Sequence, residues 1–163
     1  MAFICTLVDT EDYVNVRRDG NSYQVSSQVG YDDGSEKIYY IVIALDVVPG
    51  WDCELRYWLD EYDGELESFY TYWDGFEVAQ FIGKDDRKKI LGSLLSLVRH
   101  LVTLTRPPVV MMCTKDEEPA PMRKHVLVAQ AIGSCGYNIQ TFDSYFGQRV
   151  WRMELRETAD VVA

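Results

Sequence analysis

The sequence predicts an α+β fold, in which two helices pack on a mixed, mostly antiparallel sheet. Three observations lead to this prediction. Through about residue 82, apolar side chains alternate with polar ones or form short β-branched runs, and glycine-containing turns separate the runs. From residue 84 onward, apolar residues recur with the period of a helix, in two segments separated by a short apolar strand. The chain then ends with two strand-like runs.

Length and composition fit one soluble domain spanning residues 1–163. The chain has 163 residues, 47% of them hydrophobic and 26% charged, which is enough to bury a core without disulfides or metals. No apolar run reaches the length that crosses a membrane, and the N-terminus lacks the pattern of a signal peptide. The four cysteines are far apart in the sequence, so we expect reduced thiols, no metal site and a cytoplasmic location.

The first half predicts an antiparallel meander. Residues 1–9 predict a first strand, and residues 23–31 alternate between apolar and polar side chains, as in a half-exposed strand. Asp33-Gly34 predicts a hairpin turn. Residues 38–45 are apolar on both faces and rich in β-branched side chains, so we expect a central strand that is covered on both sides.

A second hairpin is predicted further along the meander. Residues 53–59 and 66–73 would pair around the turn Tyr62-Asp63-Gly64, and a short helix over residues 52–61 is the alternative. Residues 75–82 predict one more strand. This strand would lead directly into a basic segment.

The second half begins with a predicted crossover helix. Apolar residues at helical spacing place it over residues 86–104, with Asp85 as its N-cap and Pro107-Pro108 as its stop. Residues 109–113 then predict a short buried strand. We expect this strand to join the same sheet as the meander.

A second helix and a hairpin complete the prediction. The helix would have Pro121 in its first turn and end at Gly136, which suits a left-handed C-cap. Residues 137–142 and 148–156 predict two strands of a closing hairpin, and residues 157–163 form a tail.

Charge divides the chain into two halves. Residues 1–83 hold seventeen acidic and four basic residues, a net charge of −13, and residues 84–163 hold nine acidic and twelve basic residues, a net charge of +3, which gives −10 for the whole chain. The acidic half repels nucleic-acid backbones and attracts cations. We therefore expect a basic protein or a cationic small molecule as partner, and neither nucleic acid nor membrane. The plainer interpretation is that the acidity maintains solubility.

A basic segment lies where the meander meets the first predicted helix. A helix N-terminus favours an anion, because its free backbone N–H groups and the helix dipole both attract negative charge. If an anionic cofactor binds anywhere, the sequence predicts that it contacts Arg87, Lys88, Leu91 and Gly92.

The predicted order of meander, helix, strand, helix and closing hairpin resembles the GNAT superfamily of acyltransferases over roughly residues 23–155. The family's pyrophosphate loop begins with arginine or glutamine and has glycine at its fourth position and glycine or alanine at its last. Arg87 and Gly92 match the outer positions, and Ile90 stands at the fourth. An isoleucine there obstructs the close approach of the backbone to a pyrophosphate.

The second helix carries the other part of the resemblance. In the family it commonly ends in a tyrosine four residues before a Gly-Phe or Gly-Tyr pair. This chain keeps Gly136-Tyr137 but has Ile132 at the tyrosine position, and Val126 where the family often has an asparagine. Ile132 cannot supply the proton that a leaving thiolate takes up.

The resemblance implies acetyl-CoA as cofactor and an amine as substrate if the chain is an N-acyltransferase. In that case we expect Glu77 as the general base and Tyr145 as the replacement proton donor. If the chain is not an enzyme, no cofactor is expected.

The second hairpin combines carboxylates with aromatic residues. Residues 60–67 hold five carboxylates without the alternating spacing of a calcium loop, so we expect a solvated hairpin tip. Most nearby aromatic residues are expected to be cross-strand packing pairs, but aromatics among carboxylates also suit a cation or a basic protein. The expected partner-binding residues are Trp58, Asp60, Tyr62, Asp63, Glu65 and Glu67.

Three functional classes follow from these features. The first is a non-catalytic, GNAT-like domain that binds a basic protein through its acidic, aromatic-rich half, as an inhibitor, immunity or accessory protein would. The second is an acetyl-CoA-dependent N-acetyltransferase acting on an amine. The third is a structural or assembly subunit whose acidity is incidental. The sequence favours the first class, because the glycine of the loop and the tyrosine of the second helix are missing independently.

Overall fold

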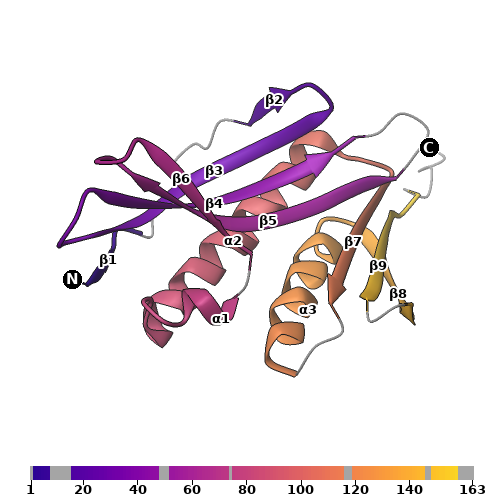
Figure 1. The fold of residues 1–163 in the computed structure, drawn as a ribbon. Helices are drawn as coiled ribbons and strands as arrows, with labels where there is room; N and C mark the ends of the chain where they lie inside the picture. Colours follow the sequence, from indigo (N-terminus) through magenta and orange to yellow (C-terminus); the bar gives the residue numbers. More distant parts are fainter. Residues whose placement is uncertain are drawn as a thin grey trace.

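A nine-stranded sheet forms the centre of the structure (Figure 1). The computed structural model describes residues 2–7, 16–47, 52–73, 75–115, 119–145 and 148–157. Neighbouring strands lie in the order β1-β3-β4-β5-β7-β9-β8, with β2 added to β3 and β6 added to β5. The strands are β1 (Phe3–Cys5), β2 (Arg17–Asp19), β3 (Ser22–Asp32), β4 (Lys37–Asp46), β5 (Cys53–Asp63), β6 (Ser68–Tyr72), β7 (Val109–Lys115), β8 (Tyr137–Tyr145) and β9 (Gln148–Leu155).

Three helices lie between these strands in the described part of the chain: α1 (Gly75–Val78), α2 (Lys84–Thr105) and α3 (Pro119–Gly133). The α+β class is confirmed, and so is the mixed, mostly antiparallel sheet, because β5 and β7 pair in parallel and the other pairs are antiparallel. The crossover through α2 is also confirmed. The short α1 is one helix more than the two predicted. None of these helices is long and apolar enough to span a membrane.

The strands predicted for the meander before residue 75 are confirmed. β3 and β4 pair around the predicted turn at Asp33-Gly34. β5 pairs with β6 from Leu59 to Asp63, so the second hairpin is confirmed, but its turn lies at residues 64–67 and not at the predicted Tyr62-Asp63-Gly64. The alternative of a helix over residues 52–61 is therefore wrong. The first predicted strand survives as the short β1.

The predicted strand over residues 75–82 is wrong, because these residues form α1 and a turn. Val78 and Ile82 are joined by a backbone hydrogen bond of 3.0 Å, so they lie on one side of a helical turn. Ile82 is fully buried, and the Phe81 ring lies 5.1 Å from that of Tyr39. A short apolar run fits either a buried strand or a buried helical turn by periodicity alone.

Helix α2 begins earlier than predicted and without the predicted cap. Its N-cap is Gly83, which makes no side-chain capping hydrogen bond, so the prediction of Asp85 as N-cap is wrong. Asp85 lies in the first turn instead, where a carboxylate is favourable next to the positive end of the helix dipole. The helix ends as predicted before the two prolines, with Arg106 in the left-handed conformation at φ 44°.

The two faces of the sheet have different surroundings. One face packs against the helices and forms a single core, which includes Val25 and Ile43 from the meander, Leu101 from α2 and Met153 from β9. Figure 1 shows the helices gathered on that side of the sheet. Because side chains alternate along a strand, even-numbered residues of β4 and β5 point to the other side. We call this side of β3–β6 the open face.

Two different strands, β6 and β7, pair with opposite ends of the same edge of β5. β4 covers the other edge along its whole length. On the shared edge, β7 pairs only with Cys53 and Glu54, while β6 pairs only with residues 59–63. Residues 55–58 thus have no strand partner on this edge among the described residues. β6 and β7 leave β5 at opposite ends, as Figure 1 shows.

Two glycines of this fold make a matched stability test. A Cβ at Gly30 would overlap the carbonyl oxygen of Ile4 and the ring of Phe3, whereas a Cβ at Gly92, inside α2, would meet nothing within 4 Å. We expect Gly30→Ala to destabilise the fold by about 1–3 kcal/mol, because β1 must move away from β3. Gly92→Ala should stabilise it by about 0.5–1 kcal/mol through helix propensity. Chemical denaturation of both variants measures the two signs.

Candidate functional site

Exposed apolar side chains concentrate around β6. Of the nine large hydrophobic residues that are exposed in the described part of the chain, five lie between residues 66 and 76. Leu66, Phe69 and Trp73 are 74%, 68% and 62% exposed, and Tyr70 and Phe76 complete the group. Scattered exposed apolar residues are ordinary, but several around one strand are typical of an interaction surface. Phe69 and Trp73 lie on the open face, whereas Tyr70 pairs with Glu61 and lies on the other side of the sheet.

The open face of β5 and β6 carries two aromatic pairs with a carboxylate between them. The rings of Trp58 and Trp73 lie 5.1 Å apart, and those of Tyr62 and Phe69 lie 4.9 Å apart. Asp60 lies between the pairs and accepts a 2.7 Å hydrogen bond from the hydroxyl of Thr71. We call this set the aromatic–acidic face. It consists of Trp58, Asp60, Tyr62, Phe69, Thr71 and Trp73.

This order follows from strand register. Asp60 pairs with Thr71, and Tyr62 pairs with Phe69, so each aromatic pair lies two residues from the carboxylate along the strands. On β4, the partner of Asp60 is Tyr40, a third aromatic neighbour. Facing residues in a sheet have Cβ atoms about 4.5–5.5 Å apart, so all of these side chains belong to one surface.

Asp60 differs in its charge pairing from three carboxylates in or next to the strands. Asp46 pairs with Arg56 at 2.6 Å, and Asp52 and Glu154 both pair with Arg152 at 3.7 Å. Among the described residues, the hydrogen-bond partner of Asp60 is a neutral hydroxyl. The aromatic–acidic face therefore presents a negative charge that the described part of the chain does not neutralise.

The other predicted partner-binding residues lie at the end of β5 and in the turn that follows it. Asp63 is an organising residue, because its carboxylate accepts hydrogen bonds from the backbone N–H groups of Glu65 and Leu66 at 3.0 and 3.3 Å. Glu65 and Glu67 are exposed in the turn. The structure thus brings Trp58, Asp60 and Tyr62 together on the open face and places the two glutamates next to it.

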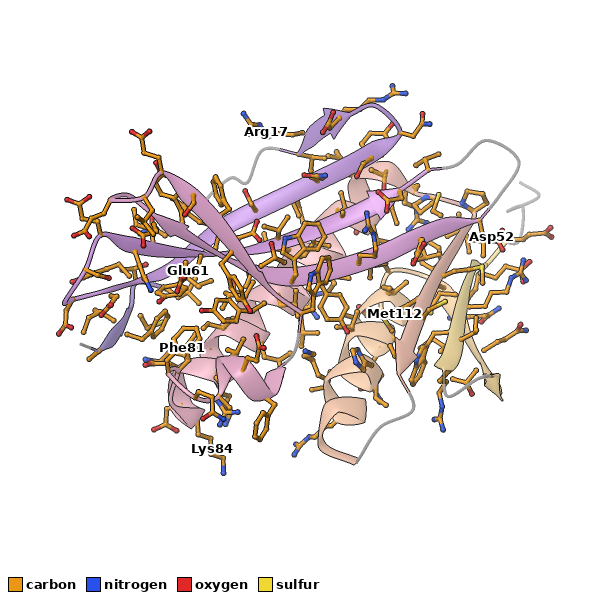
Figure 2. The ribbon with its side chains drawn as sticks, in the orientation of Figure 1. Arg17, Asp52, Glu61, Phe81, Lys84 and Met112 are labelled. Atoms are coloured by element: carbon orange, nitrogen blue, oxygen red, sulfur yellow. The ribbon has the colours of Figure 1, made fainter. Side chains whose placement is uncertain are left out.

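Glu61 is the residue that sequence reasoning placed wrongly, in a solvated hairpin tip. It is 8% exposed on the helix-facing side of β5. Its Oε1 accepts hydrogen bonds from Tyr39 at 2.9 Å and Tyr72 at 3.1 Å, and Lys37 lies 3.7 Å from its Oε2. Burial, followed by the nearby Glu61 carboxylate, raises the pKa of Tyr72 to about 12. Both tyrosines therefore remain donors at neutral pH. In Figure 2, Glu61 lies above Phe81 at the left end of the sheet.

A second polar contact lies where β6 and β7 diverge from β5. The Tyr57 hydroxyl is hydrogen-bonded to Nδ1 of His125 on α3, and the two rings lie 5.8 Å apart. Lys124 lies over the Tyr57 ring at 5.5 Å. Burial, followed by the charge of Lys124, lowers the pKa of His125 to about 4, and burial raises the pKa of Tyr57. At neutral pH the tyrosine therefore donates to a neutral imidazole.

The residues predicted for cofactor binding do not form a loop. Arg87, Lys88, Leu91 and Gly92 lie inside α2, which begins at Lys84. Backbone N–H groups beyond the first turn of a helix donate hydrogen bonds to the carbonyl oxygens four residues earlier. The N–H groups of Leu91 and Gly92 are thus engaged within the helix, so this geometry does not support their contact with a pyrophosphate, and the contact stays a prediction.

The two residues predicted for catalysis are not brought together. Glu77 lies in α1, where its carboxylate is 3.5 Å from the Tyr70 hydroxyl, rather than on the predicted strand. Tyr145 ends β8, at the far edge of the sheet, and its side chain lies outside the described residues. Three strand intervals separate β5 from β8. The structure gives no common site for this pair.

Comparisons of the chain with protein-family models, with curated proteins and with solved structures gave no match.

The contact between Tyr57 and His125 predicts a pH-dependent stability. Because the folded state lowers the pKa of His125 from 6.5 to about 4, the unfolded state binds a proton more readily between these values. Stability is therefore fully present above pH 6.5 and falls as the pH decreases toward 4. The imidazole is partly accessible, which reduces the effect to about 1–2 kcal/mol.

Denaturant unfolding between pH 7 and 4.5 measures this loss. His125→Gln keeps an acceptor for Tyr57 and removes the titrating ring, so it should lose about 1–2 kcal/mol less than the wild type on acidification. His100→Gln, at an exposed position of α2, is the matched control. Equal acid sensitivity in the wild type and His125→Gln would contradict the assignment.

Proposed function

We propose that this protein is a non-catalytic domain that binds a basic protein through the open face of β5 and β6. The observation that supports this best is the aromatic–acidic face, where two aromatic pairs, each with one exposed ring, flank a carboxylate that has no cationic partner among the described residues. The helices cover the opposite side of the sheet and leave this side accessible. An inhibitor, immunity or accessory protein would use such a surface.

The apolar part of the face provides affinity. Burying a side chain of the size of Phe or Leu contributes about 1.5–3 kcal/mol relative to leaving it in water. Phe69, Trp73 and Leu66 are each more than 60% exposed, so a partner that covers them gains several such contributions. Aromatic residues near the centre of an interface are typical binding hot spots.

The acidic residues in and beside the face attract a basic partner during association. Residues 1–83 have a net charge of −13, and Glu65 and Glu67 lie exposed beside the aromatic pairs. Charge of this kind attracts a basic partner over distances up to the screening length, about 8 Å at physiological salt. The partner is therefore expected to be a protein segment with several arginine or lysine residues.

The GNAT-like assignment of the fold belongs to this proposal. The observed order of meander, helix α2, strand β7, helix α3 and hairpin β8–β9 supports it. Against catalysis, Ile132, at the position of the family's tyrosine, is fully buried in the core. A proton donor is therefore lacking at that position, and the basic segment of α2 is helical. The order of elements supports common architecture, and these residues favour a binding role.

The test uses a synthetic peptide of alternating arginine and serine, about twelve residues long, which can span both strands. Tryptophan fluorescence in a stopped-flow instrument gives its association rate with the full chain. We expect Glu65→Lys/Glu67→Lys to slow association about tenfold at low salt and much less at high salt. Glu154→Lys/Glu157→Lys, on and after β9, is the control with the same charge change.

The outcomes separate specific binding from general attraction. A larger effect of the turn variant than of the β9 variant supports the proposed face. Equal effects of both variants would show that net charge alone attracts the peptide. Absence of binding by the wild-type chain would contradict the proposal directly.

A second candidate function is an acetyl-CoA-dependent N-acetyltransferase, favoured by the divergence of β5 and β7 toward their carboxyl ends. Ligands of α/β sheets commonly bind at the carboxyl ends of parallel strands where neighbouring strands separate. Acetyl-CoA at 100 times its Kd should stabilise a binder by about 2.7 kcal/mol, so a thermal-shift assay tests this function. An unchanged Tm at millimolar acetyl-CoA leaves the binding role or a structural, assembly role.

A further inference from the structure

We infer that the aromatic–acidic face binds one arginine side chain of the partner, with its guanidinium on the Asp60 carboxylate between the two aromatic pairs. This inference rests on the proposed function and specifies its chemistry. It assigns the specificity of the surface to a single position, whereas the acidic turn contributes general attraction.

Aromatic pairs flank Asp60 on both sides along the strands. Residues two apart on a strand are separated by about 6.6–6.8 Å, so aromatic pairs lie at this distance on either side of Asp60 along β5 and β6. Trp58 and Trp73 form one boundary, and Tyr62 and Phe69 form the other. A planar group that contacts the carboxylate then lies within the range of cation–π attraction, about 6 Å from a ring centroid.

One oxygen of the Asp60 carboxylate accepts a hydrogen bond and the other is open to a partner. Thr71 donates to Oδ1 of Asp60 at 2.7 Å, and this bond holds the side chain in one orientation on the open face. Within the described part of the chain, Oδ2 of Asp60 accepts no hydrogen bond and is available to a donor from a partner. Asp60 is partly buried, so a charge-assisted bond there is screened less than one in the turn.

An arginine of the chain itself already combines a carboxylate with an aromatic ring on this side of the sheet. Arg56 pairs with Asp46 and places its guanidinium 5.9 Å from the centroid of Trp58. The face thus already shows one arginine combining a carboxylate with an aromatic ring. Asp60 lies four residues beyond Arg56 on β5 and offers the same combination of carboxylate and ring, and the described part of the chain supplies no ion-paired cation to it.

The chemistry of the face favours arginine over lysine. A guanidinium is planar, stacks on aromatic rings and donates along two directions to a carboxylate, while an ammonium is a compact and strongly hydrated charge. The two flanking aromatic pairs therefore favour a planar cation, which can stack on the rings. Lysine would satisfy the carboxylate but make poorer contact with the rings.

The experiment compares the arginine–serine peptide with a lysine–serine peptide of the same length, on the full chain. Two-dimensional amide and indole NMR spectra report binding, with the indole N–H signals of Trp58 and Trp73 as the local reporters. We expect the arginine peptide to bind at least about fivefold more tightly than the lysine peptide and to shift both indole signals.

Asp60→Asn tests the position of the contact. Asparagine keeps the oxygen that accepts from Thr71 and removes the charge, so the amide spectrum should remain that of the folded chain. We expect Asp60→Asn to weaken binding of the arginine peptide about tenfold and to abolish the preference over lysine. Glu65→Gln removes one charge from the exposed turn of the same hairpin and should change the Kd by about twofold or less.

The failures of the two proposals are distinguishable. If neither peptide shifts signals of β5 and β6, the proposed function fails and the arginine site fails with it. If both peptides bind this face with equal affinity, or if Asp60→Asn keeps the preference for arginine, the arginine site is overturned while the proposed binding surface stands.

Discussion

Phe69→Ser combined with Trp73→Ser is expected to weaken binding of the arginine–serine peptide by at least about 100-fold, because two hot-spot aromatics contribute about 2 kcal/mol or more each. Both rings are mostly exposed in the free chain, at 68% and 62%. The double variant should therefore leave the free energy of unfolding within about 1 kcal/mol of the wild type. Isothermal titration and chemical denaturation measure these two quantities.

A matched control separates the position of the rings from their apolar character. Leu104→Ser removes a large exposed apolar side chain, 63% accessible, from α2 on the other side of the sheet. It should leave the peptide affinity within about twofold, because a residue outside an interface contributes little to binding. A similar loss of affinity in both variants would mean that the peptide adheres to apolar surface without regard to place.

Glu61→Ala is expected to produce the largest loss of stability, about 2–4 kcal/mol. Removing one partner of a buried polar network leaves the other members unsatisfied. In this variant the hydroxyls of Tyr39 and Tyr72 lose their acceptor, and Lys37 loses its ion pair. Chemical denaturation gives the change in unfolding free energy.

Glu61→Gln and Glu65→Ala complete this test. Glutamine keeps one acceptor oxygen without the charge, so we expect a loss of about 1–2 kcal/mol. Glu65→Ala, in the exposed turn, should change stability by no more than about 0.5 kcal/mol. If Glu61→Ala were as stable as Glu65→Ala, the buried network would contribute nothing to the fold.

The strands that the sequence predicted are those with strong local patterns. Residues 38–45 are apolar on both faces, and the structure places them in β4 between β3 and β5. In the same way, Asp33-Gly34 predicted the hairpin of β3 and β4, and the helical spacing after residue 84 predicted α2. By contrast, residues 75–82 have a short apolar pattern that fits a strand or a helical turn, and contacts with Tyr39 and Tyr72 decide in favour of the turn.

The candidate site was predictable in part. The aromatic and acidic residues of the hairpin were visible in the sequence, but their division between two faces depends on register. Because side chains alternate along a strand, Glu61 shares a face of β5 with the buried Leu55 and Leu59. This alternation indicated that Glu61 faces the helices, but the acidic composition of the segment obscured it. Tyr57 and His125 are 68 residues apart, and no local pattern indicates that they meet.

Amide hydrogen exchange of the full chain, with and without the arginine–serine peptide, tests the open face most directly as the binding surface. Binding should slow exchange of amides in residues 58–62 and 68–73, because a bound segment limits solvent access and local opening there. We expect no comparable protection in α2, including the basic turn with Arg87 and Lys88. Protection centred on α2 or on β8 and β9, with β5 and β6 unchanged, would contradict it.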